Sequence, residues 1–229
     1  MNLIKFALPS SVGKKFLMGL SGLLLVLFVI GHMVGNLQIF LGPETINQYA
    51  HFLKSMPKFL WSARVGLLAC VAVHILTAIS LAADNRKARG AQPYASGSPY
   101  KASFASRTMA WSGVIVLSFI VYHLAHFTVG WINGDFLNWK DASGHPDVYR
   151  MVVVGFQSVP VSLFYILSMA LLCFHLSHGV SALCQSIGLR TDGNRSLVDK
   201  LAIGLSSAIF VGNCSIPLSV LTGIIKWPL

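Results

Sequence analysis

Long apolar segments alternate with short polar segments along the whole chain. We place five apolar segments, at about residues 16–41, 59–83, 107–133, 159–187 and 197–225. A transmembrane helix needs about 20 predominantly apolar residues, and each of these segments is long enough. The first is too long for a signal peptide, and no small-residue cleavage pattern follows it. The pattern predicts an all-α integral membrane protein with a bundle of five transmembrane helices, rather than a soluble all-α core.

The composition agrees with a single membrane domain over residues 1–229. Hydrophobic residues make up 55% of the chain and charged residues 10%, which is too little charge for a soluble domain of this size. Lys and Arg are most frequent before the first segment and in the second and fourth connections, which predicts a cytoplasmic N-terminus and a C-terminus outside. The net charge of +10 is therefore attributed to topology and to contact with lipid or partners. Nucleic-acid binding is not expected, because no soluble basic module is present.

The connections carry few chemical signals. Residues 84–106 are predicted to form a cytoplasmic loop, and residues 134–150 an outer loop. Residues 42–58 are predicted to form a short amphipathic segment at the outer interface, and Pro160 suits an early position of the fourth helix. The four cysteines all lie in predicted spans and form no C-x-x-C motif, so neither a zinc site nor covalent attachment of c-type haem is supported.

Four histidines, one in each of the first four segments, are the main candidates for function. They are His32, His74, His123 and His175. An ionisable or metal-binding side chain inside a membrane is costly, and it is a functional candidate by default. At 1.5 Å of rise per residue, His32 and His123 lie about 16–18 Å from the outer ends of their helices, and His74 and His175 about 22–24 Å. Equal depth therefore predicts two pairs, separated in level by roughly 6 Å.

The missing ligands indicate which metal group such pairs would hold. Two imidazoles without a carboxylate or thiolate partner do not complete a zinc or non-haem iron site, whereas haem needs only axial ligands. We therefore expect two bis-histidine b haems, which suit electron transfer. The alternative for each histidine is a hydrogen bond between helices. By spacing alone, His126 and His178 could replace His123 and His175, because each lies three residues on, close to the same helix face. His51 and His145, in outer segments, are poor ligands.

The order and spacing of these histidine segments resemble a known family. The chain is similar to the cytochrome b membrane-anchor subunit of succinate:quinone oxidoreductases and fumarate reductases, in its single-subunit, five-helix, di-haem form. The resemblance spans essentially the whole chain, and it is carried by VIGHMVGNLQ around His32, YAHFLKSMP at 49–57, VAVHIL around His74, SFIVYH ending at His123 and FHLSHGVSAL from Phe174. It implies that His32 pairs with His123 for an outer haem and His74 with His175 for an inner haem, and it favours His123 over His126 and His175 over His178.

The resemblance also implies a place in a larger enzyme of the tricarboxylic acid cycle and the respiratory chain. The expected partners are a flavoprotein that interconverts succinate and fumarate and an iron–sulfur protein, both on the cytoplasmic side of a bacterial inner membrane. The chain itself would carry electrons to or from a membrane quinone, with menaquinone as the usual partner of the di-haem form. The complex could form a higher oligomer. Two other functions remain open: a di-haem subunit of another dehydrogenase, oxidising formate or hydrogen, and a haem-free transporter or scaffold.

Further candidate residues depend on this interpretation. The only glutamate, Glu44, could exchange protons with a quinone together with Gln48 and His51, although a solvated loop carboxylate is the simpler interpretation. Gly31 and Gly35 flank His32 at small-xxx-small spacing, which suits either close helix packing or room for a porphyrin edge. Haem propionates need cationic or polar partners, and the candidates are Lys15, Arg64, Arg107, Lys58 and Arg190.

Overall fold

The computed structural model describes residues 10–89 and 108–227, and its regular elements are helical. In chain order they are α2 (Ser11–Leu37), η1 (Gln38–Leu41), α3 (Pro43–Ser55), α4 (Pro57–Arg89), α6 (Met109–His123), η2 (Leu124–Thr128), η3 (Gly134–Leu137), α7 (Val148–Gln157), α8 (Val159–Ser186) and α9 (Arg195–Leu221). Within the described residues, five helical segments are long and apolar enough to cross a membrane. They contain α2, α4, α6, α8 and α9, so the predicted all-α, five-helix membrane fold is confirmed.

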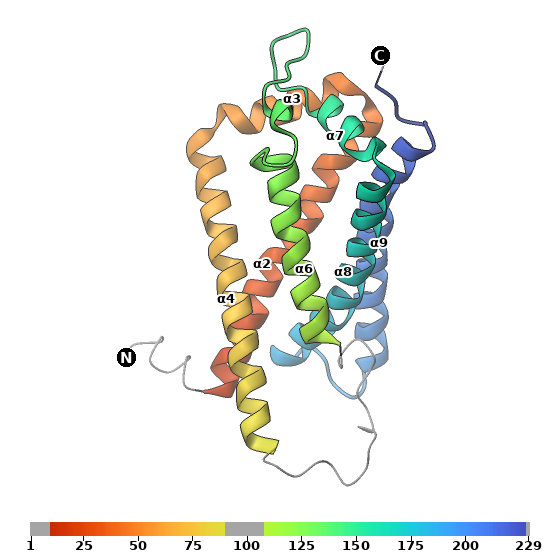
Figure 1. Cartoon of the computed structure of the whole chain (residues 1–229). Helices are drawn as coiled ribbons and strands as arrows, with labels where there is room; N and C mark the ends of the chain where they lie inside the picture. Colours follow the sequence, from red (N-terminus) through yellow and green to blue (C-terminus); the bar gives the residue numbers. More distant parts are fainter. Residues whose placement is uncertain (1–9, 90–107, 228–229) are drawn as a thin grey trace.

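Short elements cover one end of the bundle, which we call the capped end (Figure 1). There α3 runs across the bundle between α2 and α4, and α7 lies beside it. Gly42 has φ +107°, a conformation that favours glycine, and Pro43 then starts α3 at a position where its missing N–H is not needed. The opposite end, where α2 begins and α4 ends, is called the open end. The predicted interfacial segment at 42–58 therefore contains a helix, α3.

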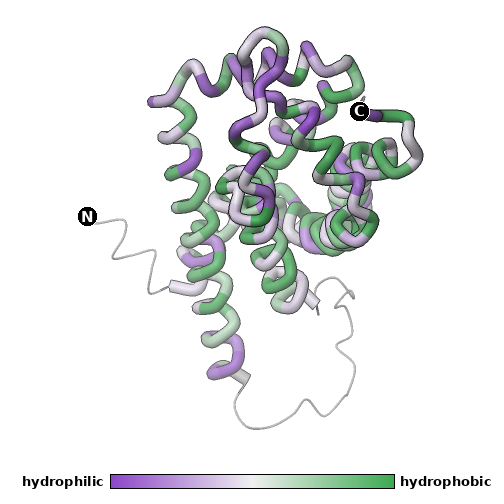
Figure 2. Tube along the Cα trace, turned by 45° about the horizontal axis from the view of Figure 1, so that its top comes forward, coloured by the Kyte–Doolittle hydropathy of each residue, from purple (hydrophilic) through white to green (hydrophobic). Residues whose placement is uncertain are grey.

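The long helices bury small polar residues as well as apolar ones and expose many apolar side chains outward. The most extensive packing is between α8 and α9 and between α2 and α4, and α8 also contacts α2 and α6. Ser162, Ser168 and Ser206 are buried, and each hydroxyl donates to a carbonyl of the preceding turns of its own chain. Leucines such as Leu76 and Leu201 are exposed. Figure 2 shows that hydrophobic residues make up much of the length of the long helices. This is the pattern of a helix bundle in lipid.

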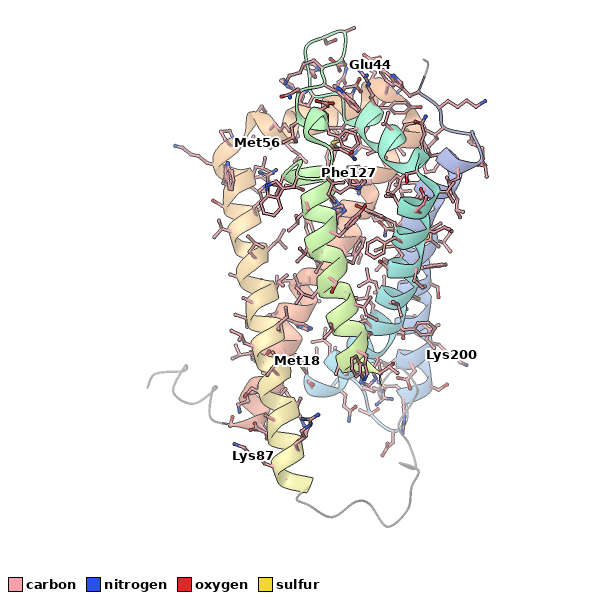
Figure 3. The ribbon with its side chains drawn as sticks, viewed as in Figure 1. Met18, Glu44, Met56, Lys87, Phe127 and Lys200 are labelled. Atoms are coloured by element: carbon pink, nitrogen blue, oxygen red, sulfur yellow. The ribbon has the colours of Figure 1, made fainter. Side chains whose placement is uncertain are left out.

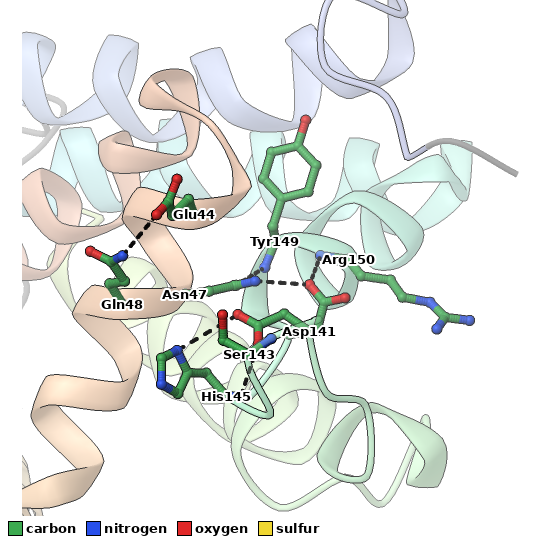
Figure 4. Close-up of polar contacts among 9 residues, drawn as sticks. Glu44, Asn47, Gln48, Asp141, Ser143, His145, Tyr149 and Arg150 are labelled. Carbon is green, nitrogen blue, oxygen red and sulfur yellow. Dashed lines mark hydrogen bonds and ion pairs between the residues drawn. The ribbon is translucent and has the colours of Figure 1, made fainter.

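The prediction of an outer loop over residues 134–150 is wrong in part. It contains η3 and the first turn of α7, which begins at Val148. The buried Asp147 carboxylate caps α7 by accepting the Arg150 backbone N–H at 3.0 Å, and it also accepts from the Asn47 amide at 3.2 Å. The Asn47 carbonyl oxygen in turn accepts the Tyr149 N–H at 2.9 Å (Figure 4). An amide and a carboxylate thus join α3 to the start of α7.

The third membrane-spanning segment is also shorter and less regular than predicted. Its α-helix ends at His123, and a π turn follows over Leu124–Thr128, with the Val129 N–H bonded to the Leu124 carbonyl at 2.8 Å. A π turn holds more residues than an α turn, so it rotates the side chains that follow. His123 is the last residue of the α-helix and His126 lies within the π turn, so α-helical spacing does not describe their relative position.

Candidate functional site

The four intramembrane histidines meet in two pairs across the bundle. The ring centres of His32 and His123 are 5.8 Å apart, and those of His74 and His175 are 6.3 Å apart. The first pair joins α2 to α6, and the second joins α4 to α8. Neither of these two helix pairs belongs to the extensively packed ones in the described part of the chain, so each histidine pair bridges helices at opposite corners (Figure 1). The structure brings together both pairs that equal depth predicts.

The spacing of each pair fits two imidazoles on one metal ion. With nitrogen about 2.0 Å from the metal and about 1.1 Å from the centre of its ring, two opposed imidazoles have ring centres about 6.2 Å apart. Both observed distances lie within half an ångström of that value. Within residues 10–89 and 108–227, no group of three or more His, Cys, Asp or Glu side chains is placed to hold a metal ion. The donor set therefore fits a metal that brings its own equatorial ligands, as haem does.

Hydrogen bonds decide which ring nitrogen is free in the second pair. His74 Nδ1 lies 3.2 Å from the Met18 carbonyl oxygen, which can only accept, so Nδ1 carries the proton. His175 Nδ1 and the Met109 carbonyl oxygen each lie 3.1 Å from Ser112 Oγ; if the hydroxyl hydrogen goes to the carbonyl, which can only accept, this Nδ1 is also the donor. In both rings Nε2 is then unprotonated, which is the form that binds a metal.

His123 and His126 have different surroundings, although they lie three residues apart. Tyr165 Oη lies 3.5 Å from His123 Nδ1 and 3.1 Å from His126 Nδ1. The His126 side chain is 1% exposed and packs against the Phe127 ring at 3.9 Å between centres, whereas the four paired histidines each keep an accessible surface. The structure therefore places His123, and not His126, opposite His32. The role of these residues as ligands stays a prediction.

The two pairs are farther apart along the bundle than the sequence arithmetic predicts. The His74 ring contacts Ser21 of α2, and His32 lies eleven residues later on the same helix. The His175 ring contacts Ser112 of α6, and His123 also lies eleven residues later. Eleven residues of α-helix rise about 16 Å, so the expected separation of roughly 6 Å was too small. Helix tilt and helix ends that are uncertain by several residues can enlarge or erase a separation counted in this way. In Figure 3, Met18 marks the open-end level and Phe127 the capped-end level.

Comparison with known proteins adds a family to this geometry. The model of the succinate dehydrogenase/fumarate reductase transmembrane subunit family matches residues 85–212, more than half of the chain. The chain belongs to this family. No curated protein and no solved structure matched. The matched region contains His123 and His175 but neither His32 nor His74, so the family match does not cover the α2 and α4 halves of the two pairs. The family makes this chain a multi-pass membrane subunit that associates with the other subunits of the enzyme.

Gly31 and Gly35, which flank His32 in this transmembrane subunit, have different surroundings. A Cβ added at Gly35 would come within 2.8 Å of the Tyr49 ring, so Gly35 allows α3 to pack closely on α2. A Cβ at Gly31 would meet nothing within 4 Å. The Gly35 contact thus corresponds to close packing, one of the two predicted uses of the glycine pair, whereas Gly31 faces open space.

The candidate cations for haem propionates are scattered. Lys15 is exposed at the open end, and the Arg64 guanidinium lies 5.1 Å above the Trp61 ring near the capped end. Arg190 donates to both Asp199 oxygens, at 3.0 and 2.9 Å, so its guanidinium is already engaged. Arg107 lies outside the described residues. His178, the alternative to His175 as a ligand, is half-buried. The charges that act on it are those of Arg190 and Asp199, which form an ion pair.

The residues proposed for quinone chemistry lie on α3. Glu44 and Gln48 are exposed and hydrogen-bonded to each other at 3.1 Å (Figure 4). His51, one turn further, stacks on His145 with 4.0 Å between ring centres. The two histidines assigned to outer segments are thus in contact, which sequence could not show because 94 residues separate them. Three residues that contact the histidine pairs were also missed: Ser21, Ser112 and Tyr165. Tyr165 has no sequence signal beyond a hydroxyl within an apolar run, whereas Ser21 and Ser112 each lie eleven residues before a paired histidine, His32 or His123.

Proposed function

We propose that this subunit is a di-haem cytochrome b that carries electrons between the iron–sulfur subunit of its complex and a membrane quinone. The observation that supports this most directly is the pair of diagonal histidine contacts, with ring centres 5.8 and 6.3 Å apart. Two such pairs at levels about 16 Å apart suit a relay along the bundle. When bound, b haem supplies one-electron redox chemistry, and ligation from both faces suits electron transfer rather than activation of a small molecule.

The side chains of this subunit would hold and orient these groups. Nε2 of His74 and His175 would bind from opposite faces, while the Met18 carbonyl and Ser112 Oγ hold their Nδ1–H groups. Nε2 of His32 and His123 would do the same nearer the capped end, where Tyr165 Oη, 3.5 Å from His123 Nδ1, would accept the Nδ1–H of His123. Such outer partners fix the ring orientation and raise the basicity of the ligand.

The two ends of the bundle would face different partners. The open end would lie at the cytoplasmic side of a bacterial inner membrane and receive the flavoprotein and iron–sulfur subunits. The capped end would lie outside, where Glu44 and Gln48, with His51 beside them, would exchange protons with menaquinone. A carboxylate that can take up and release protons near the interface provides what quinone reduction or quinol oxidation requires.

The test of this function is haem quantitation with reduced-minus-oxidised spectroscopy on the purified subunit. We expect two low-spin b haems per chain. In His74→Ala and in His175→Ala, one haem should be lost and the other retained, because each pair serves one haem. His178→Ala is the matched control, since it removes a neighbouring histidine of the same helix and should leave both haems in place. A colourless wild-type preparation, or single variants that keep both haems, would refute the proposal.

A further inference from the structure

A sequence element occurs twice in the helices that carry the capped-end pair. Residues 18–32 read Met-x-x-Ser-Gly-x9-His, and residues 109–123 repeat the same spacing. The first copy lies in α2 and the second spans α6. Serine and histidine are eleven residues apart, close to three turns of 3.6 residues, so they lie on one face of the helix about 16 Å apart. Each helix therefore offers a histidine to one level and a Ser-Gly pair to the other.

The α2 copy holds the His74 ring mainly through backbone. His74 Nδ1 donates to the Met18 carbonyl at 3.2 Å, and Ser21 Oγ is farther away, at 3.4 Å. A Cβ added at Gly22 would come within 3.2 Å of His74 Cε1, which is tighter than most real contacts of a Cβ atom. The absence of a side chain at Gly22 is thus what lets the ring lie against α2.

The α6 copy holds the His175 ring through its hydroxyl. His175 Nδ1 lies 3.1 Å from Oγ of the buried Ser112, and it is the donor when Ser112 gives its own hydrogen to the Met109 carbonyl, also at 3.1 Å. A Cβ added at Gly113 would lie 3.7 Å from His175 Cε1, an ordinary van der Waals distance. Each Ser-Gly pair therefore contacts one histidine ring. In α2 the closer contact is made at the glycine, and in α6 it is made by the serine.

We propose that Gly22 and Ser112, one residue from each Ser-Gly pair, position His74 and His175 and thereby determine the affinity and potential of the haem that these histidines bind. This inference rests on the proposed di-haem function. Ser112 is the positioning residue on the α6 side, because without it the Nδ1–H of His175 loses its acceptor. Gly22 is the positioning residue on the α2 side, because a Cβ there would lie 3.2 Å from His74 Cε1 and the ring would have to move by a few tenths of an ångström. Ser21 is the counterpart of Ser112 in α2, and Gly113 is the counterpart of Gly22 in α6. The contact of Ser21 with the His74 ring and that of Gly113 with the His175 ring are not required.

The experiment compares four alanine variants of the full-length subunit in its membrane complex. Ser112→Ala and Gly22→Ala should each weaken retention of the open-end haem by about 10-fold or more, the usual effect of losing such support. Ser112→Ala should also raise the midpoint potential of any open-end haem that remains, because a less basic imidazole stabilises ferric iron less well. Ser21→Ala and Gly113→Ala are the matched controls and should behave as wild type. Ser112→Thr, which keeps the hydroxyl, should restore the potential.

The redox component of the open-end haem is assigned by its loss in His175→Ala. Four variants with the wild-type content and potential, in a protein that holds two haems, would overturn the positioning role and leave the di-haem function intact. A shift of the capped-end component in Ser112→Ala or Gly22→Ala, or loss of both haems, would also overturn it, because the proposed effect is confined to one level. Wild-type protein without haem would refute the proposed function itself, and the inference with it.

Discussion

A histidine in this bundle becomes a candidate ligand or a packing residue through the atoms around its ring. His126 is enclosed by aromatic rings and bonded to Tyr165, so no space for a metal remains at its surface. His123 shares Tyr165 but faces His32. If His123 donates its Nδ1–H to the tyrosine oxygen, the phenolic hydrogen is free to bind His126 Nδ1. One hydroxyl can therefore satisfy both rings, and it leaves His123 Nε2 free toward His32.

The role of Glu44 in proton exchange can be tested by a change of one atom. Glu44→Gln keeps the size of the side chain and its contact with Gln48 but cannot release a proton. If this carboxylate exchanges protons with the quinone, we expect quinone turnover to fall by about 100-fold, as is typical when an acid–base group is lost. Both haem spectra should stay unchanged. Glu44→Asp, which keeps the acid, should retain most of the turnover, and wild-type rates in the Gln variant would exclude Glu44 from the site.

At the scale of helices, hydropathy predicts the features that depend on long apolar runs. It does not predict the features that depend on contacts between neighbouring helices. The five spans follow from run length alone, and the mixture of polar and apolar residues in α3 predicts a position at the interface. The first turn of α7 was assigned to a loop although Asp147 directly precedes it and VYRMVVVGF is periodic, which together are an N-cap signal. The π turn after His123 has no comparable sequence signal. The pairs of histidines were predictable from depth, whereas their serine partners depend on which helices are adjacent.

The junction between α3 and α7 depends on one buried amide. Asn47 is 1% exposed, and it bonds both the Asp147 carboxylate and the Tyr149 N–H. Asn47→Ala removes both bonds and leaves buried polar groups unsatisfied, so we expect a loss of about 1–3 kcal/mol in the free energy of unfolding. Asn138→Ala, at an exposed position of the same end, should change it by less than about 0.5 kcal/mol. Thermal or denaturant unfolding of the purified subunit would measure both, and equal stabilities would contradict the role of Asn47.

Across the whole molecule, the charge distribution sets the two ends apart. Eight of the 14 Lys and Arg residues within residues 10–89 and 108–227 belong to segments at the open end, where Lys87 and Lys200 lie in Figure 3, and Glu44 lies at the capped end. Several of these cations are paired: Lys14 with Asp84 at 2.6 Å, and Arg190 with Asp199 at 2.9 Å. Pairing lowers the net charge of this end without weakening the orientation signal, because topology follows the number of Lys and Arg residues and acidic residues contribute little.

The orientation that follows can be measured by labelling single cysteines in intact cells. Ser143 is exposed in the loop at the capped end, and Lys87 is exposed at the open end of α4. We expect a membrane-impermeant maleimide to label Ser143→Cys in intact cells and Lys87→Cys only after permeabilisation. The unsubstituted chain sets the baseline, because its four cysteines lie in the membrane-spanning helices. The reverse pattern would place the capped end in the cytoplasm, and the open end could then not receive the cytoplasmic subunits of the complex.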